Sequence, residues 1–398
     1  MLPVPAFAAR RLTSLCRTRC RLEVLSRIAV HRRTFVQNSG TIRSEARRYE
    51  STLVESQVKT ANDNSALVYR PPTTGIISRL PASWIPYAEL IRLDKPAGTY
   101  YLYFPCLFST LLAAQMAAPV STPGQVVSTA ALFFGGALIM RGAGCTINDL
   151  WDRNLDPHVE RTRLRPIARK VVSPRQAVVY VGFQLLAGLG VLLQFPTTCL
   201  YYGIPSLLFV ATYPLAKRVT NYPQFVLGLT FSWGAMMGFP ALGVDMLANQ
   251  AALASAAALY ASCVTWTLNY DMIYAFMDIK DDVNAGIKSI ALAHDHNAKA
   301  VLYGLSGVQV ALLGAAGYFA GAGPIFFIGS CGGAAIALTT MVRRVDLRDV
   351  KDCWWWFRNG AWITGGTISL GLLGDYLYDW SFRSQRVEKQ SDAQPGRS

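Results

Sequence analysis

The sequence predicts an all-α integral membrane protein with nine transmembrane helices. Hydrophobic residues make up 52% of the chain and charged residues only 16%, whereas soluble domains carry about 25% charged residues. From residue 98 onward the apolar residues form runs long enough to cross about 30 Å of hydrocarbon as helices. This composition excludes a disordered chain, a collagen, a coiled coil and a small disulfide scaffold. It also argues against a soluble nucleic-acid binder, despite the net charge of +14.

The N-terminal region carries half of the excess charge. Residues 1–40 contain eight arginines and one acid, Glu23, interspersed with Leu, Val, Ser and Thr. An Arg-rich, acid-poor segment of this kind is typical of a mitochondrial transit peptide. The alternative is a basic tail that binds lipid or nucleic acid, but the hydrophobic body that follows favours the transit peptide.

The rest of the chain divides into three parts by composition. Residues 41–85 are predicted to be a polar linker and juxtamembrane segment, residues 86–380 a polytopic membrane domain, and residues 381–398 a disordered tail. The nine predicted spans are 98–117, 125–143, 176–194, 198–212, 224–241, 250–269, 300–319, 324–342 and 359–378. The fourth span is short and contains Pro205.

The charge of the loops supports this count. The loops after the second, fourth, sixth and eighth spans carry 16 Lys and Arg residues, and the loops after the first, third, fifth and seventh carry none. The positive-inside rule then places the even-numbered loops and the N-terminus on one face of the membrane. With a mitochondrial transit peptide, that face is the matrix side of the inner membrane.

A first acidic cluster follows the second span. Asn148, Asp152 and Asp156 are spaced i, i+4 and i+8, and Asp149 lies three residues before Asp152. On a helix that continues out of the span, these side chains share one face. Carboxylates on one stripe repel one another unless a cation lies between them.

A second acidic cluster follows the sixth span, on the same side of the membrane. Asp271, Asp278 and Asp282 are spaced i, i+7 and i+11 and again share a helical face. A single cluster would be explained by a solvated helix end that pairs with nearby Arg and Lys. Two such clusters on one side favour function, because acids next to a membrane span are costly.

The ligand types point to Mg²⁺ and a diphosphate. Oxygen ligands without His or Cys suit Mg²⁺, which binds through a few carboxylates together with substrate phosphates. Nearby cations are available to neutralise the remaining phosphate charge: Arg161, Arg163, Arg165, Lys217, Arg218 and Lys288. The sequence contains no CxxC, GxxxxGK[ST], GxSxG or HExxH motif, so structural zinc, nucleotide hydrolysis, acyl transfer and zinc hydrolysis lack support.

These motifs resemble those of the UbiA membrane prenyltransferases. Asn148-Asp149-x-x-Asp152-x-x-x-Asp156, followed by Arg161 and by Arg165-Pro166, is similar to the first aspartate motif of the family, and Asp278-x-x-x-Asp282 with Lys288 resembles the second. The run from Tyr213 to Lys217-Arg218 resembles the YxxxK element after the fourth helix, and the stretch from Arg92 through Lys95-Pro96 to Thr99 resembles the entry to the first. These resemblances extend from about residue 88 to residue 378.

The resemblance implies a nine-helix bundle around a central cavity, with a lateral opening for a lipid tail. The stretches 222–228, 233–234 and 271–275 resemble the branch of the family that prenylates 4-hydroxybenzoate in ubiquinone biosynthesis. The implied reaction is Mg²⁺-dependent transfer of a polyprenyl group from polyprenyl diphosphate to the ring carbon ortho to the phenol. Membrane lipid and a complex of ubiquinone-biosynthesis enzymes are the further expected partners, and nucleic acid is not expected.

The resemblance also implies roles for individual residues. Asn148, Asp152 and Asp156 would bind one Mg²⁺, Asp278 and Asp282 a second, and Asp149 is an additional candidate ligand. Arg161, Arg165, Tyr213, Lys217, Arg218 and Lys288 would bind the diphosphate. Arg92 or Lys95 would hold the carboxylate of the aromatic acceptor, unless these residues serve as juxtamembrane anchors, and Asp271 would orient or deprotonate its phenol. Tyr274 and Trp266 either shield the allylic cation by cation–π contact or serve only in helix packing.

Two other functions compete with this interpretation. A cation-coupled transporter would place its acids near helix centres and break its helices at the midplane, whereas these acids lie at helix ends. Another UbiA enzyme, such as a haem-modifying farnesyltransferase or a prenyltransferase of another aromatic compound, is the nearer rival. The transit peptide and the Tyr270–Ala275 stretch argue against the haem-modifying farnesyltransferase and against the prenyltransferase of another aromatic compound.

The sequence departs from the family at one position. Lys170 stands where family members usually have glycine after the Arg165-Pro166 run. If that position adopts a positive φ to turn into the third helix, lysine costs about 1 kcal/mol of strain.

Overall fold

The computed structural model describes residues 69–158, 162–279 and 288–392. The chain divides into two units, Met1–Arg70 and Pro71–Ser398, and nearly all described residues belong to the second. The predicted transit peptide, most of the predicted linker, and Arg161 and Asp282 among the predicted site residues lie outside the described residues.

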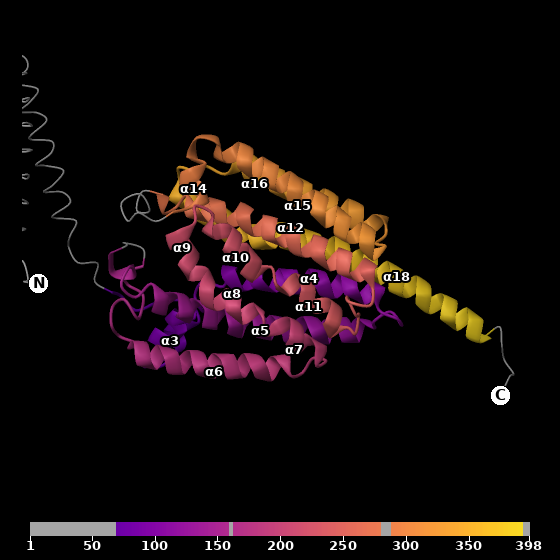
Figure 1. Cartoon of the computed structure of the whole chain (residues 1–398), viewed down its shortest axis with the longest axis horizontal. Coiled ribbons are helices and arrows are strands. Elements are labelled where there is room, and N and C mark those ends of the chain that lie inside the picture. Colours follow the sequence, from indigo (N-terminus) through magenta and orange to yellow (C-terminus); the bar gives the residue numbers. More distant parts are fainter. Residues whose placement is uncertain (1–68, 159–161, 280–287, 393–398) are drawn as a thin grey trace, which may run out of the picture. The chain divides into compact units, whose positions relative to one another are not determined.

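The second unit is built of helices, and its described residues contain no strand (Figure 1). In chain order the elements are η1 (Ile77–Arg79), α3 (Ile85–Leu90), α4 (Ala97–Met116), α5 (Pro123–Trp151), η2 (Asp156–His158), α6 (Pro174–Leu192), α7 (Thr198–Gly203), α8 (Ser206–Thr212), η3 (Tyr213–Leu215), α9 (Ala216–Val219), α10 (Pro223–Phe231), α11 (Gly234–Ala241), α12 (Gln250–Ala275), α14 (Ile290–Ala293), η4 (Asp295–Asn297), α15 (Ala298–Ala320), η5 (Phe326–Gly332), α16 (Gly333–Arg344), α17 (Val350–Gly360), η6 (Ala361–Gly366) and α18 (Thr367–Asp392). The predicted all-α class is confirmed.

The long helices begin at residues that cap them. Thr122 and Ser173 each form a capping box with the glutamine three residues on, and a proline follows each cap directly. The side chain of Asn249 accepts hydrogen bonds from the first amides of α12. These caps satisfy amides that would otherwise lack partners at the helix ends.

Five helical segments among the described residues are long and apolar enough to cross a membrane. They are Pro123–Trp151, Pro174–Leu192, Gln250–Ala275, Asp295–Ala320 and Phe326–Arg344. They coincide with the second, third, sixth, seventh and eighth predicted spans. The other four predicted spans are also helical, but the count of nine stays a prediction.

Two of those four spans are interrupted. The fourth is divided into α7 and α8 at Pro205, whose ring cannot continue the hydrogen-bond ladder of α7. The fifth is divided into α10 and α11 at Ser232–Trp233, and the Trp233 indole donates to the carbonyl of Tyr202 in α7 at 2.6 Å. Below this break, Ser109 Oγ donates to the carbonyl of Gly234 at 2.8 Å and accepts from the amide of Gly238 at 3.0 Å, which ties α11 to α4.

A ladder of hydrogen bonds fixes the register of α12 against α15, which run beside each other (Figure 1). Ser255 Oγ donates to the carbonyl of Ala316, and Ser262 Oγ donates to the carbonyl of Gln309, both at 2.9 Å. One heptad further on, Asn269 Nδ2 donates to Ser306 Oγ at 2.7 Å. Asn269 lies two residues before Asp271. The register therefore also fixes the position of Asp271 along the axis of α15.

The C-terminal helix extends further than the composition indicates. Helix α18 continues to Asp392, whereas the sequence predicts a disordered tail from residue 381. Residues 381–392 contain no Gly or Pro and include Arg, Gln, Glu and Lys, which have high helix propensity. The helix therefore continues past the last apolar residues.

Lys170 has the left-handed backbone conformation that the glycine of the family suggested. Its φ is +64°, in the turn that leads into α6. Replacing Lys170 with glycine is therefore expected to raise the free energy of unfolding by about 1 kcal/mol, because glycine relieves the steric cost of this conformation. Thermal unfolding of the purified protein in detergent measures the change. Lys170→Ala retains the Cβ and should leave stability near that of the wild type, so an equal gain in both variants would contradict the strain argument.

Candidate active site

The first acidic cluster lies where α5 ends. Helix α5 carries Asn148 and Asp149 in its last turn, Asp152 is its C-cap, and Asp156 begins η2. The helix therefore continues past the predicted span as far as Trp151, but it ends before Asp152 and Asp156, so the predicted single helical face does not extend to these two residues. The three aspartates are almost fully buried, at 0% exposure for Asp149, 7% for Asp152 and 5% for Asp156. Buried carboxylates need compensating cations or hydrogen bonds.

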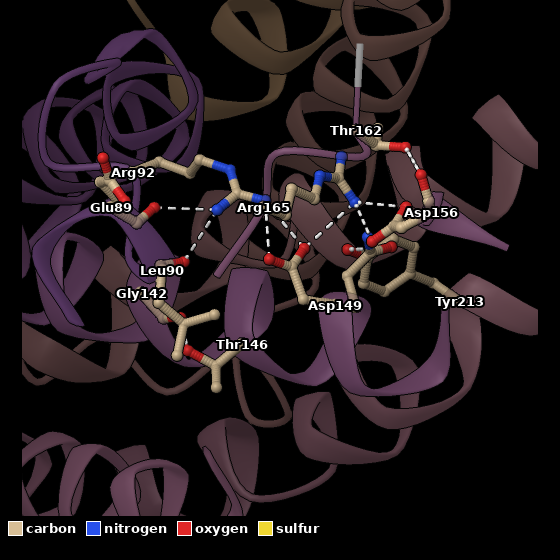
Figure 2. Close-up of polar contacts among 11 residues, drawn as sticks. Glu89, Leu90, Arg92, Gly142, Thr146, Asp149, Asp156, Thr162, Arg165 and Tyr213 are labelled. Carbon is tan, nitrogen blue, oxygen red and sulfur yellow. Dashed lines mark hydrogen bonds and ion pairs between the residues drawn. The ribbon is translucent and has the colours of Figure 1, made fainter. Parts of the chain in front are cut away.

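Two arginines from segments distant in the sequence converge on Asp149 (Figure 2). Arg92 Nη2 donates to both carboxylate oxygens of Asp149, at 2.8 and 2.9 Å. Arg165 Nη1 lies 3.1 Å from Oδ1 of the same carboxylate. Arg92 itself has a φ of +59°, and its Nη1 donates to the carbonyls of Glu89 and Leu90 at 2.9 and 3.2 Å. The structure thus places Arg92, a predicted acceptor-binding residue, on Asp149.

Arg165 bridges Asp149 and Asp156. Its Nη1 lies 3.1 and 3.0 Å from the two carboxylate oxygens of Asp156, in addition to the contact with Asp149. The pKa of Asp156 is raised by burial and by the nearby carboxylates of Asp149 and Asp152, although Arg165 acts in the opposite direction. The cation that the spacing of the carboxylates requires is therefore supplied by the protein itself.

The predicted YxxxK element meets this cluster through its tyrosine. Tyr213, the first residue of η3, donates from its hydroxyl to Asn148 Oδ1 at 3.4 Å. Trp151 Nε1 donates to the carbonyl of Ala211 at 3.1 Å, which ties the end of α5 to α8 beside it. Lys217 and Arg218 belong to α9, but their side chains lie outside the described residues.

The second acidic cluster is described only in part. Asp271 and Tyr274 lie in the last two turns of α12, Asp278 lies three residues past its end, and all three are half-buried. Within the described ranges, no group of three or more His, Cys, Asp or Glu side chains is close enough to hold a metal ion. Of the remaining predicted site residues, Lys95 and Lys288 are exposed.

Trp266 is buried among other aromatic rings of the helix bundle. It is 2% exposed, and its ring contacts those of Tyr101, Phe104, Phe108 and Tyr270 at centroid distances of 5.3 to 6.3 Å. Tyr274 is less enclosed and packs against Phe357 at 4.5 Å. Of the two aromatic residues, Tyr274 is therefore the more exposed one.

Arg141 is a site residue that the sequence reasoning missed. It lies in α5 two turns before Asn148, and its guanidinium carbon lies 5.6 Å from the centre of the Phe231 ring. A Cβ on Gly98 would come within 2.7 Å of the guanidinium, so glycine leaves the room that Arg141 occupies. The signal was an arginine inside the predicted span 125–143, where a charged residue is costly and usually functional.

Arg141 is an unusual cation because it has no carboxylate partner. Among the described residues no acid forms an ion pair with it, and its buried Nε has no hydrogen-bond partner. Its electrostatic neighbours are Cys145 and the hydroxyls of Tyr213, Tyr270 and Tyr274. These tyrosines come from η3 and α12, so the guanidinium of Arg141, on α5, is within electrostatic range of the helix that carries the second acidic cluster.

The sequence matches a known family over most of the helical unit. The sequence model of the UbiA prenyltransferase family matches residues 102–365. The mitochondrial 4-hydroxybenzoate polyprenyltransferase of Saccharomyces cerevisiae is 46% identical over 303 residues, which cover 76% of this chain and 79% of that protein. The protein of the same name from Schizosaccharomyces pombe is 45% identical over 300 residues, covering 74% and 82%.

Solved structures share the fold at low sequence identity. A UbiA homolog from Aeropyrum pernix in its apo form has a TM-score of 0.56 and 20% identity, covering 72% of this chain and 98% of that one. A UbiA homolog from Archaeoglobus fulgidus bound to DMAPP and Mg²⁺ has a TM-score of 0.53 and 16% identity, covering 74% and 99%.

Proposed function

Because the chain belongs to the UbiA prenyltransferase family, we propose that it transfers a polyprenyl group from polyprenyl diphosphate to 4-hydroxybenzoate. The reaction forms a carbon–carbon bond at the ring position ortho to the phenol and releases diphosphate and a ring proton. The names of the relatives support 4-hydroxybenzoate as the acceptor. We place the reaction in ubiquinone biosynthesis.

The observation that carries this proposal is the first acidic cluster, Asn148, Asp149, Asp152 and Asp156 at the end of α5, which is called the acidic stripe from here on. Asn148 in the last turn of α5, Asp152 at its C-cap and Asp156 in η2 offer only oxygen ligands, which suits Mg²⁺. A cationic nitrogen, Arg165 Nη1, already lies among three carboxylate oxygens of Asp149 and Asp156, so these two carboxylates accommodate a positive charge. Asp278 and Asp282 would hold a second ion. When bound, Mg²⁺ supplies charge neutralisation for the leaving diphosphate.

The protein's own cations would bind the remaining phosphate charge. Arg165 is 18% exposed at its side chain and reaches the acidic stripe, and Tyr213 lies beside Asn148. Arg161, Lys217, Arg218 and Lys288 are the further candidates. Donors fixed around the diphosphate stabilise the negative charge that develops as the allylic C–O bond breaks.

Arg141 is the residue we assign to the acceptor's carboxylate. A buried guanidinium without a carboxylate partner favours an anionic ligand, and Arg141 of α5 is within electrostatic range of Tyr270 and Tyr274 of α12. Arg92 is already paired with Asp149, and Lys95 is exposed. With its carboxylate at Arg141, the acceptor would present its ring near Tyr274, and Asp271 would orient or deprotonate the phenol.

Exclusion of water from the cation would fall to the segments that cover the end of α5. Leu90 of α3 packs with Ile167 and Val172 of the loop before α6. Arg169 of that loop pairs with Glu89 of α3 at 2.6 Å. An apolar cover over the reacting centre protects the allylic cation from hydrolysis.

The proposed location is the mitochondrial inner membrane, with the site on the matrix side. The curated relatives are mitochondrial enzymes, and the sequence contains 16 basic residues in alternate loops. The positive-inside rule places these loops, which carry both acidic clusters, on the matrix face. Association with other ubiquinone-biosynthesis enzymes is part of the same proposal.

An assay with membranes that contain this chain, Mg²⁺, a polyprenyl diphosphate and 4-hydroxybenzoate tests the function. We expect a prenylated acid whose formation stops on addition of EDTA and resumes when Mg²⁺ is restored. Prenylation that survives EDTA would contradict the role of the metal. A series of phenolic acids and other aromatic acceptors, none of which gives a prenylated product, would contradict the choice of acceptor.

A further inference from the structure

The guanidinium of Arg165 occupies the position of a cation within the acidic stripe. One nitrogen, Nη1, contacts both oxygens of Asp156 and one oxygen of Asp149, all at 3.0 to 3.1 Å (Figure 2). Asp156 is also a proposed Mg²⁺ ligand. We propose that Arg165 and Mg²⁺ compete for Asp156, so that the metal binds tightly only together with a diphosphate that draws Arg165 away. This inference rests on the proposed function for the identity of the metal and of the diphosphate.

The competition follows from geometry and charge. A Mg²⁺ ion needs its ligand oxygens at about 2.0–2.1 Å in near-octahedral arrangement, whereas Arg165 Nη1 contacts both oxygens of Asp156. A guanidinium held there would repel the incoming divalent cation at close range and block its approach to Asp156. Binding of the metal therefore requires Arg165 to leave.

Asp149 and Asp156 differ in whether a cationic partner remains after Arg165 has moved away. Asp149 keeps Arg92, whose Nη2 donates to both of its oxygens. For Asp156, Arg165 is the one cation that forms an ion pair among the described residues. Departure of Arg165 thus leaves Asp149 neutralised and Asp156 available to the metal. The ion pair between Arg92 and Asp149 stays in place, whereas Arg165 moves away from Asp156.

A diphosphate gives Arg165 a second place to bind. Guanidinium pairs well with phosphate oxygens, often through two parallel hydrogen bonds. The Arg165 side chain is 18% exposed, so a phosphate can approach it. Because diphosphate removes the competitor of the metal, each ligand strengthens the binding of the other, and the effect is reciprocal.

Arg165→Gln separates this competition from a purely structural role. Isothermal titration of the full chain in nanodiscs with Mg²⁺ alone is expected to show about tenfold tighter binding in the variant, since a charge-assisted contact to a ligand carboxylate is lost. A residue that only supports the fold would weaken metal binding when removed. Equal or weaker Mg²⁺ affinity in Arg165→Gln, with thermal unfolding unchanged, would overturn the inference.

Arg169→Gln is the matched control. Arg169 belongs to the same loop, is 12% exposed at its side chain and pairs with Glu89. The same substitution there removes a charge that pairs with Glu89 rather than with Asp149 or Asp156. Its Mg²⁺ affinity should equal that of the wild type, and a tightening like that of Arg165→Gln would attribute the effect to the loop and overturn the competition.

A second measurement needs no variant. Mg²⁺ affinity of the wild type is measured with and without saturating inorganic pyrophosphate, corrected for the magnesium pyrophosphate that forms in solution. We expect a strong gain with pyrophosphate, and a gain about tenfold smaller in Arg165→Gln. Equal Mg²⁺ affinity of the wild type with and without pyrophosphate would overturn the inference. Because neither titration requires prenyl transfer, failure here is distinct from failure of the proposed function.

Discussion

Replacing Asp152 with asparagine is expected to lower the rate of prenyl transfer by about 10²–10³-fold, the scale on which loss of one group that stabilises developing charge slows an enzyme. Asp152 is buried at the C-cap of α5, between Asn148 and Asp156. Asparagine keeps its size but removes the negative charge that a Mg²⁺ ligand supplies. The measurement is kcat for product formation at saturating substrates, over a series of Mg²⁺ concentrations.

Two comparisons make this expectation specific. Asp295→Asn removes an acid that pairs with Arg348 at an exposed position, at 3.0 Å, and should keep full activity. The double variant Asp152→Asn/Asp282→Asn should lose less than the product of the two single losses, because residues that act as one unit are not additive. An Asp152→Asn protein with half or more of the wild-type kcat at every Mg²⁺ concentration would contradict the metal-ligand role.

Periodicity and apolar length were enough to predict where helices form. Every predicted span is helical, because a 20-residue apolar run in a membrane has few alternatives that satisfy its backbone. Breaks within spans were less accessible to sequence reasoning. Pro205 marked the position of one without a break being predicted there, and the break at Ser232–Trp233 depends on the Trp233 contact with Tyr202 in another helix.

The acidic stripe was predictable as a pattern but its partners were not. The spacing of Asn148, Asp152 and Asp156 indicates one helical face, and the structure has α5 continuing to Trp151. One of the two arginines that pair with Asp149, Arg92, lies 57 residues away. Local patterns do not show which of many exposed or buried cations will reach a given acid, since that depends on helix packing.

The second large loss of activity is expected on replacement of Arg141. Arg141→Gln is expected to lower kcat/KM for 4-hydroxybenzoate by about 10²–10³-fold, because loss of one partner of a buried charge pair costs about 2–5 kcal/mol or more. The position of Arg141 beside Gly98 and Phe231 leaves its guanidinium without an acid of the described chain. The acceptor's carboxylate would then be its partner.

A change in the acceptor distinguishes this role from simple support of the fold. 4-Hydroxybenzamide has nearly the shape of 4-hydroxybenzoate but carries no charge, so it makes no ion pair that Arg141→Gln could remove. The variant should therefore lose far more activity with the acid than with the amide, and Arg141→Lys, which keeps the charge, should recover part of the preference for the acid. Equal losses with both acceptors would instead mean that Arg141 supports the helix packing or the diphosphate. The ratio of the two kcat/KM values decides the matter, because any general damage to the protein cancels in it.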